Sequence, residues 1–383
     1  MKSEIISLVI NVRKLEKRMS YAERLKGVQT ILSKNKIDAL LIDHPKDLLY
    51  LTGIELSAGK LLATRNGAHL LVDGRYIEKC KRESPIPVIL AQDNSLQELL
   101  ASPNLEKIGF DSEQTSFKAY KDLDKIIFQI NKIDNKNLNL VPIDNPIKQL
   151  RSIKDATELR LMNEAAILGS EGFDYVCLLL KEGITEAEVA LKLEIFWKER
   201  GGKSVAFDPI IAFGPNSSMP HYRAGNVKLT KGQPVLIDIG VTLKNYHSDM
   251  TRTLFFGPPD PKLIEIYDIV KEAQQKALDL CKPGISVGAL DEAARKLIAS
   301  KGYGENFSHS LGHGIGLDVH EYPIIRNKSP YKEQVLEPRM VITIEPGIYL
   351  PDIGGVRIED TIVITKGGYI NLTKRPKGKI IIN

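Results

Sequence analysis

Cysteine is scarce in this sequence of 383 residues, which contains only Cys80, Cys177 and Cys281. Three cysteines that lie far apart form neither a disulfide framework nor a CxxC metal site. The sequence therefore argues against a disulfide-stapled secreted protein and against a thiolate-bound metal. The three thiols are expected to be buried in a reducing compartment, which favours a cytoplasmic location.

Long hydrophobic runs are also missing, since no segment approaches the ~20 apolar residues that a membrane span needs. The apolar stretch Ile5–Ile10 is followed at once by basic residues and is too short for the apolar region of a signal peptide. The residues before Met19 are expected to be an ordered extension or the result of an upstream start, because Met19 precedes a plausible helix cap at Ser20. No membrane partner is expected.

Positive charge is not concentrated anywhere, although the formal net charge is +5. Lysine and arginine are spread along the chain without the basic stripe of a nucleic-acid-binding face, so no nucleic-acid partner is expected. Hydrophobic residues make up 43% and charged residues 26%, which is the balance of a soluble globular protein. A chain of this length is expected to form two domains.

The first 150 residues predict an α/β domain, in which short strands alternate with helical stretches. Strands at Lys60–Thr64 and His69–Val72 are joined by Arg65-Asn66-Gly67, and the Asn-Gly pair is a hairpin signal. His44 is isolated in this region, as is His69, and both are expected to be structural. The predicted domains are residues 1–150 and 151–383, and the fold class is α/β (α+β).

The second domain contains an internal repeat. Helices are predicted over residues 156–181, 185–200, 261–281 and 287–301. The sequence Lys-Glu-Gly-Ile-Thr that ends at Thr185 resembles the sequence Lys-Pro-Gly-Ile-Ser that ends at Ser286, and both end residues suit a helix N-cap. The domain is therefore predicted to consist of two similar halves, related by a pseudo-two-fold axis.

Four carboxylates repeat between these halves, within predicted strands. Asp238 in the first half corresponds to Glu345 in the second, and Asp249 corresponds to Glu359. A tight turn around residues 243–246, taken as centred between residues 243 and 244, predicts that Asp238 and Asp249 lie directly opposite each other on paired strands. Facing like charges about 4.5 to 5.5 Å apart destabilise a sheet, and a divalent cation reverses that effect.

A structural explanation is possible for each acid taken alone, since Asp249 could pair with Arg252 and Asp238 could accept backbone hydrogen bonds. The repetition of four such acids favours metal instead. A nitrogen ligand is available in His313, which glycines flank on both sides. His221 and His320 lie in matching parts of the two halves, while His247 and His309 are assigned to supporting or surface roles.

An oxygen-rich site with one imidazole suits manganese, cobalt or ferrous iron, and zinc is an alternative. Two ions about 3.5 to 4 Å apart could activate water and stabilise a tetrahedral intermediate.

In these residues the chain resembles the metallopeptidase family with the pita-bread fold, and particularly its proline-specific branch of prolidase and aminopeptidase P. The motifs span about 150 residues: Phe207–Ala212, Pro220-His221, Asp238–Thr253, Gly312–Gly316, Val319–Glu321, Glu345–Gly347 and Gly354–Asp360. Tyr50–Gly53 and Asp73–Tyr76 resemble the creatinase-type N-terminal domain. The resemblance implies that this domain precedes a pita-bread catalytic domain, and that the chain forms a homodimer.

The resemblance also implies the roles of the site residues. Asp249 and Glu359 would bridge two metal ions, Asp238 would complete one metal shell, and His313 and Glu345 would complete the other. Glu345 would also move a proton. His221 and His320 would hold the substrate carbonyl and stabilise the tetrahedral intermediate, and Arg357 would steady the carboxylates or the substrate. The implied reaction is hydrolysis of the Xaa-Pro bond in dipeptides or at the N-terminus of short peptides.

Two positions depart from the family pattern. Some dipeptidase members carry an arginine directly after the proline that matches Pro323, where it can bind the carboxylate of a dipeptide. Ile324 occupies that position here, and Arg326 follows two residues later. Arg339 stands where the family usually has glycine, so that turn is expected to differ.

The sequence has three alternative interpretations: a metal-free creatinase-like hydrolase, a methionine aminopeptidase and a non-catalytic peptide- or histone-binding protein of the same fold. The intact set of five ligands favours the metallopeptidase over the first and third. A methionine aminopeptidase shares the ligands but usually lacks the N-terminal domain.

Overall fold

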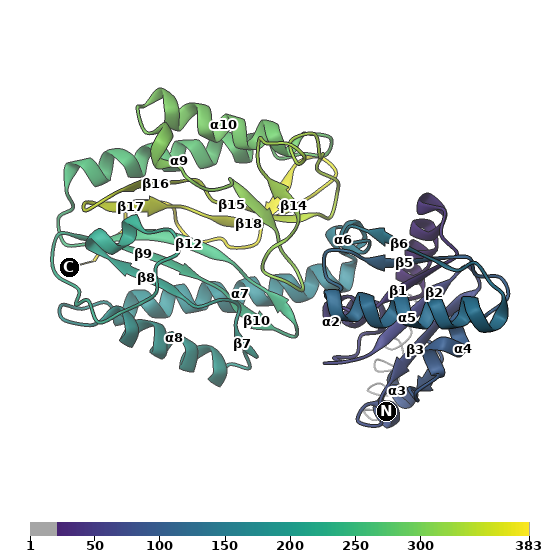
Figure 1. Cartoon of the computed structure of the whole chain (residues 1–383). Helices are drawn as coiled ribbons and strands as arrows, with labels where there is room; N and C mark the ends of the chain where they lie inside the picture. The colour runs from purple at the N-terminus through teal and green to yellow at the C-terminus, as the bar shows by residue number, and fades with distance from the viewer. Residues whose placement is uncertain (1–20, 383) are drawn as a thin grey trace, which may run out of the picture. The chain divides into compact units, whose positions relative to one another are not determined.

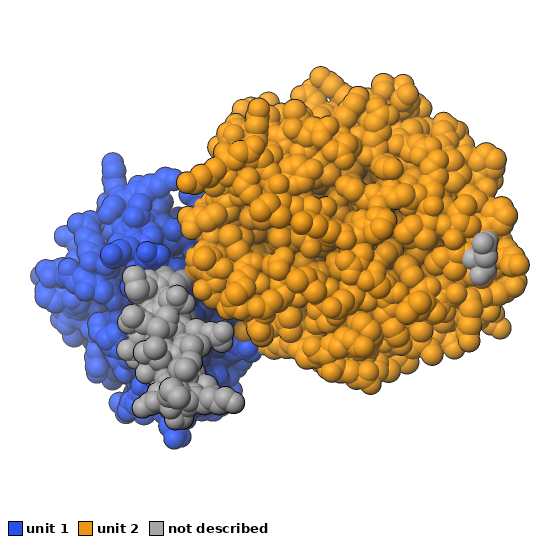
Figure 2. All heavy atoms as spheres, turned by 180° about the vertical axis from the view of Figure 1, so that it is seen from behind, with its two compact units in different colours: residues 1–151 blue, residues 152–383 orange. Residues whose placement is uncertain are grey.

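A computed structural model describes residues 21–382 of the chain. The expectations for Ile5–Ile10, Met19 and Ser20 concern residues outside this range. The chain divides into two compact units, residues 1–151 and 152–383, which Figure 2 shows in blue and orange. No helix among residues 21–382 is both long and apolar enough to cross a bilayer.

The first unit is built on a six-stranded sheet with the order β4-β3-β2-β1-β5-β6. The strands are β1 (Ala39–Ile42), β2 (Lys60–Thr64), β3 (Gly67–Val72), β4 (Val88–Leu90), β5 (Lys107–Asp111) and β6 (Asn139–Ile143). The helices are a first helix over residues 21–35, then α2 (Pro45–Thr52), α3 (Ile77–Glu83), α4 (Ser95–Leu100), α5 (Phe117–Asp134) and α6 (Lys148–Ser152). The predicted hairpin is confirmed, because β2 pairs antiparallel with β3 and Thr64 lies opposite Gly67.

The second unit contains the four predicted helices. They are α7 (Ala156–Leu179), α8 (Glu186–Glu199), α9 (Pro261–Leu280) and α10 (Val287–Ser300). The expected caps are confirmed: the side chain of Thr185 accepts a hydrogen bond from Glu188 N, and that of Ser286 accepts one from Ala289 N. Each helix pair packs its apolar face against a sheet, which gives each half its own hydrophobic core (Figure 1).

The two main sheets of this unit have the orders β20-β12-β9-β8 and β14-β13-β15-β18-β19. In the first half the strands are β7 (Ser204–Val205), β8 (Ile210–Phe213), β9 (Gln233–Ile239), β10 (Val241–Leu243), β11 (Tyr246–His247) and β12 (Met250–Phe256). In the second half they are β13 (Gly312–Gly314), β14 (Glu321–Ile325), β15 (Val341–Ile344), β16 (Gly347–Leu350), β17 (Gly354–Arg357), β18 (Asp360–Ile364) and β19 (Tyr369–Asn371). The last strand, β20 (Ile381–Ile382), joins the sheet of the first half, where it pairs with β12. Two 3-10 helices, η1 (Gly214–Ser218) and η2 (Gly304–Asn306), connect elements within the halves.

The predicted pairing of Asp238 with Asp249 is wrong. In the structure Asp238 on β9 pairs with Thr251 on β12, which places Asp249 two residues away on a diagonal. The turn lies at the predicted residues, but its centre differs. Lys244 and Asn245 form a two-residue loop with φ angles of 49° and 73°, so the chain reverses between them, one residue later than the predicted centre between 243 and 244. Such a loop suits the right-handed twist of paired strands.

The carboxylates also lie less deeply in strands than predicted. Only Asp238 lies within a strand, whereas Asp249 immediately precedes β12. The ladder between β15 and β18 ends where Ile344 pairs with Asp360, so Glu345 and Glu359 come directly beyond it. The acids are therefore held at strand ends, where a side chain can meet a neighbouring strand of the other half.

Candidate metal centre

The centre of the second unit brings together an imidazole and carboxylates from both halves. One ligand atom each from Asp249, His313 and Glu359 lies within 4.8 Å of the others. His313 Nε2 lies 3.3 Å from Glu345 Oε1 and 3.7 Å from Asp249 Oδ2. Asp249 and Glu359 are 4% and 1% exposed, so their charges are almost entirely removed from water. Such burial is costly without a compensating cation.

Two buried carboxylate oxygens in this cluster lack any hydrogen-bond partner among residues 21–382. They are Asp238 Oδ1 and Glu359 Oε1. Buried polar atoms are normally satisfied, so these unpaired acceptors show that the site is built for a group that carries positive charge. Together with the oxygen-rich donor set, they fit the divalent ions that the sequence predicts.

The pKa shifts of the acids in the cluster also indicate a site for a cation. Burial, followed by the charges of neighbouring carboxylates, raises the pKa of Asp249 well above its usual value. The same causes raise the pKa of Glu359. Glu345 differs: burial alone would raise its pKa, but the hydrogen bond and charge of His313 lower it to about 2. These acids repel one another, and a cation among them would relieve that repulsion.

Two threonines link the halves across the site, and sequence reasoning did not identify them. Thr251 Oγ1 donates to Glu359 Oε2 at 2.7 Å, and Thr361 Oγ1 donates to the backbone oxygen of Asp249 at 2.8 Å. Each half therefore orients an acidic residue of the other. The available signal was the repeated spacing, since Thr251 follows Asp249 by two residues just as Thr361 follows Glu359.

A third threonine supports His313 and Glu345. Thr343 Oγ1 accepts a hydrogen bond from His313 N at 3.0 Å and donates to Glu345 Oε1 at 3.2 Å. His313 Nδ1 lies 3.0 Å from the backbone oxygen of Gly314. This contact leaves Nε2 facing the carboxylates, as a metal-binding histidine requires.

Arg357 at the end of β17 is buried beneath the acids. It donates to Asp238 Oδ2 at 2.5 Å, to the Tyr349 hydroxyl at 2.6 Å and to Thr251 Oγ1 at 3.2 Å. Only 2% of the arginine is exposed. Its guanidinium therefore faces protein groups. His309, which was expected to be a supporting or surface residue, is half-buried and lies 2.8 Å from the same tyrosine hydroxyl through Nε2.

His221 and His320 are exposed at the edge of this cluster. The rings of His313 and His320 meet edge to face, with centroids 4.3 Å apart. Desolvation, the nearby His313 and then His221 lower the pKa of His320 to about 4. His221 follows η1, and the backbone oxygen of the preceding Pro220 accepts from Arg357 Nη2 at 3.5 Å. The structure thus gathers all eight predicted site residues around one centre.

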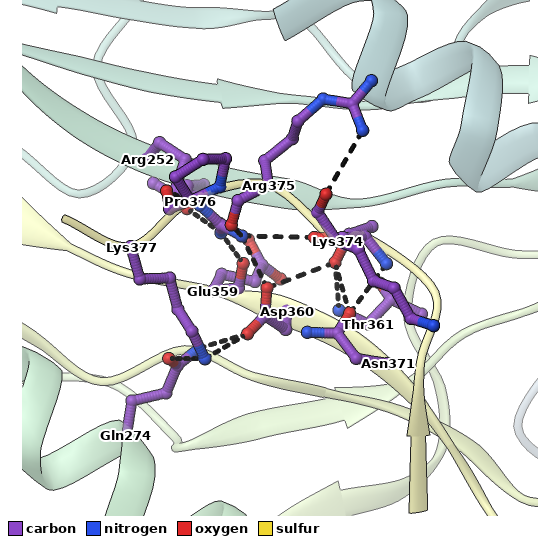
Figure 3. A network of polar contacts seen from close by, with 12 residues as sticks. Arg252, Gln274, Glu359, Asp360, Thr361, Asn371, Lys374, Arg375, Pro376 and Lys377 are labelled. Carbon is purple, nitrogen blue, oxygen red and sulfur yellow. Dashed lines mark hydrogen bonds and ion pairs between the residues drawn. The ribbon is translucent and has the colours of Figure 1, made fainter. Parts of the chain in front are cut away.

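A second polar network adjoins the acidic cluster at Glu359 (Figure 3). Arg252 Nη2 donates to Asp360 Oδ1 at 2.7 Å, and Lys377 Nζ donates to Asp360 Oδ2 at 2.7 Å. Arg252 also donates to the backbone oxygens of Glu359 and Arg375. The alternative pairing of Asp249 with Arg252 is therefore wrong, and Arg252 instead fixes the backbone next to the metal centre.

Comparison with known proteins agrees with this fold. The sequence pattern of metallopeptidase family M24 matches residues 160–366, and that of the creatinase/prolidase N-terminal domain matches residues 24–153. The chain therefore belongs to metallopeptidase family M24, with a creatinase-type N-terminal domain followed by a pita-bread domain. The predictions of family and fold class are confirmed.

Individual relatives place the chain beside the proline-specific members. It is 41% identical over 354 residues to a Xaa-Pro dipeptidase of Pyrococcus horikoshii, covering 92% of this chain and 97% of that protein. The structure of a Xaa-Pro dipeptidase from Bacillus anthracis has a TM-score of 0.88 at 33% identity, covering 95% of this chain and 100% of the other. An X-Pro aminopeptidase from Thermotoga maritima has a TM-score of 0.81 at 32% identity, covering 91% and 98%.

Proposed function

We propose that this protein is a metallopeptidase that uses two metal ions to hydrolyse the Xaa-Pro bond of dipeptides and of short peptides at their N-terminus. The observation that carries the proposal is the buried cluster of Asp249, His313 and Glu359, with an unpaired oxygen on Glu359. The proline-specific relatives supply the substrate class.

In this proposal the ligands divide as the resemblance implies. Asp249 and Glu359 would hold both ions, Asp238 would add a ligand to one of them, and His313 and Glu345 would add ligands to the other. The unpaired Asp238 Oδ1 supports its assignment as a ligand, since its other oxygen is held by Arg357. Manganese suits these oxygen donors, and cobalt, iron and zinc are alternatives.

When bound, the ions supply an activated water at neutral pH and positive charge for the developing oxyanion. Glu345 moves the proton to the departing proline nitrogen. Its Oε1 is engaged by Thr343 and His313, so we assign proton transfer to Oε2. His221 and His320 hold the substrate carbonyl and donate to the tetrahedral oxygen. Their exposed position at the edge of the cluster leaves both rings accessible to a peptide.

Arg357 steadies the carboxylates in this scheme. Its contacts to Asp238, Tyr349 and Thr251, and its burial, favour this role over contact with the substrate. The buried guanidinium is therefore unsuited to binding the free carboxylate of a dipeptide.

The segment after Pro323 would then have to bind the free carboxylate of a dipeptide. Ile324 pairs with His313 between β14 and β13, so its side chain lies on the same side of the sheet as the site. An isoleucine offers no donor to a carboxylate. The exposed Arg326 follows β14 and is the remaining candidate. We therefore propose activity on both dipeptides and short peptides, with a slight preference for dipeptides.

Three substrates test the proposal: an Xaa-Pro dipeptide, its C-terminally amidated form and an Xaa-Pro-Yaa tripeptide. Metal-stripped protein is reloaded with manganese, cobalt or zinc before each assay, and a dipeptide without proline is the control. We expect cleavage of all three proline substrates and little of the control. A dipeptide-only profile would show that a cation clamps the carboxylate after all, and no cleavage of any proline substrate would refute the assigned activity.

We also propose a cytoplasmic homodimer. The cysteines support a reducing location, since Cys80 and Cys281 are buried free thiols and Cys177 is half-buried. Light scattering tests the assembly, and the expected mass in solution is twice that of one chain.

A further inference from the structure

A fully buried carboxylate lies outside the metal centre, at the start of α8. Glu186 is the first residue of that helix and is 0% exposed. No ion pair to it is formed within residues 21–382. Its charge is instead balanced by hydrogen-bond donors and by the positive end of the α8 dipole.

Four donors surround this carboxylate. Oε1 accepts from Phe213 N at 2.8 Å and from Asn216 Nδ2 at 2.9 Å. Oε2 accepts from the Tyr222 hydroxyl at 2.7 Å and from Gly225 N at 3.0 Å. Both oxygens are therefore saturated, and each one holds a backbone N–H.

These donors come from both sides of His221. Phe213 ends β8 and Asn216 lies in η1, so they precede the histidine, while Tyr222 and Gly225 follow it. No hydrogen bond to the His221 imidazole is formed within residues 21–382. The position of this ring therefore depends on the backbone of the loop, which Glu186 holds on both sides of His221 and which Arg357 also contacts at Pro220 O.

We propose that Glu186 is a positioning residue for His221, which it acts on by holding the loop of residues 213–225 in place. The inference rests on the proposed function, in which His221 contacts the substrate carbonyl. A misplacement of about 1 Å in such a group can cost about 100-fold in rate. The buried carboxylate thus serves catalysis without touching the substrate.

Because donors surround both carboxylate oxygens, replacing Glu186 with glutamine tests the role of these hydrogen bonds while keeping nearly the same side-chain shape. The glutamine amide carries one acceptor oxygen and one NH2 group. Whichever way it is turned, the NH2 group faces a backbone N–H, that of Phe213 or that of Gly225, and neither N–H can be reoriented. Glu186→Gln should therefore loosen one end of the loop.

The matched control is Glu188→Gln on the same helix. Glu188 is exposed and caps α8 through Thr185, so this change weakens the helix start without touching the loop. We expect Glu186→Gln to lower kcat about 10- to 100-fold with both metals retained. Glu188→Gln should leave kcat within about threefold of the wild type, because it lies outside the loop that positions His221.

A double-mutant cycle separates positioning from general damage. In a His221→Ala background, adding Glu186→Gln should lower kcat little further. In a His320→Ala background, adding it should lower kcat by the same factor as in the wild type. Equal losses in both backgrounds would overturn the inference. If Glu186→Gln does not fold, Tyr222→Phe removes one donor more gently and should show the same dependence on His221; full loss in the His221→Ala background would again refute the inference.

Hydrogen exchange gives a readout that does not need activity. Peptides that cover residues 213–225 should exchange faster in Glu186→Gln than in Glu188→Gln, and unchanged exchange would contradict the proposed loop. A wild-type protein inactive on proline substrates would refute the function alone, since exchange still tests the loop.

Discussion

Asp249 is surrounded by carboxylates of its own sign, and burial strengthens their repulsion. Asp249→Asn removes one of these charges and should abolish peptidase activity while weakening metal retention. The metal-free variant should be more stable than the metal-free wild type, because one repulsive partner is gone. Metal analysis and thermal unfolding of stripped protein measure the two effects. Two ions still bound at wild-type affinity would refute the assignment of Asp249 as a ligand.

The exposed histidines should behave differently from the ligands. His221→Ala and His320→Ala are expected to keep both ions and to lose about 10²- to 10³-fold in turnover, the usual cost of one stabilising donor. Steady-state kinetics with metal analysis on the same samples checks this. If either variant lost metal while keeping its fold, that histidine would have to be reassigned as a metal ligand.

At the residue scale the sequence indicated which side chains carry charge and which motifs they belong to. The carboxylates and His313 were recognisable because buried acids and a glycine-flanked imidazole are unusual locally. Thr343 and Tyr349 were not identified, because nothing in their own sequence surroundings marks them. Thr251 was marked only by the spacing from Asp249 that Thr361 repeats from Glu359, and this spacing does not show which residue it contacts. Their roles come from partners such as Glu359, which lies 108 residues from Thr251.

At the scale of the elements, the turn before β15 contains a non-glycine residue in the strained left-handed backbone conformation. Arg339, which occupies the position of the usual family glycine, has a φ of 73° and an exposed side chain. Its backbone N–H donates to Ile364 O at 2.7 Å, so the turn is held in place. A left-handed conformation costs a non-glycine residue roughly 1 to 2 kcal/mol.

Arg339→Gly should therefore raise the free energy of unfolding, by about 0.5 to 1 kcal/mol once the greater flexibility of glycine in the unfolded chain is subtracted. Arg339→Val should lower it, because a β-branched residue tolerates this conformation poorly. Urea unfolding of metal-loaded protein compares the three. Equal stabilities for the glycine and valine variants would show that the turn relaxes freely.

The buried contact between Arg252 on β12 and Asp360 on β18 links the two main sheets of the second unit. Burial alone would raise the pKa of Asp360, but the charges of Arg252 and Lys377 lower it. Asp360→Asn should cost about 3 to 5 kcal/mol of unfolding free energy at pH 7, since it leaves the buried Arg252 without its charged partner. Because the folded pKa is below the unfolded one, this loss should shrink as the pH falls below about 4.

Asp174→Asn is the control for that experiment. Asp174 is exposed and pairs with Arg375, two residues before Lys377. An exposed pair contributes about 1 kcal/mol or less. Urea unfolding at pH 7 and at lower pH gives both numbers. Equal losses for the two variants would show that the network adjoining Glu359 does not stabilise the fold.

For the whole molecule, metal and pH should act together on stability. Asp249 and Glu359 have raised pKa values in the folded, metal-free protein, so the folded state holds extra protons above about pH 4. Their stabilising contribution is lost as the pH rises through the folded pKa values. The contribution of these two acids to the stability of the metal-free protein should therefore fall as the pH rises above about 4, and saturating metal should restore it.

Calorimetry with and without metal across this range measures the effect. The gap in melting temperature should widen as the pH rises, also because protons compete less with metal for the ligands. A gap that is the same at every pH would show that the acids do not repel in the metal-free state. Metal-free Asp249→Asn should show a weaker pH dependence than the wild type.

The sequence by itself determined the family, the two-half repeat, the helix caps and the types of the proposed ligands, because motifs and periodicity are properties of neighbouring residues. Tertiary structure decided which of these residues meet. The register is one example: Lys244 and Asn245 both adopt positive φ, so Asp238 pairs with Thr251 and not with Asp249. The partner of Arg252 is another, since the packing of the two halves brings it to Asp360. Pairings between distant strands depend on turn geometry and on the packing of the two halves, which local sequence does not specify.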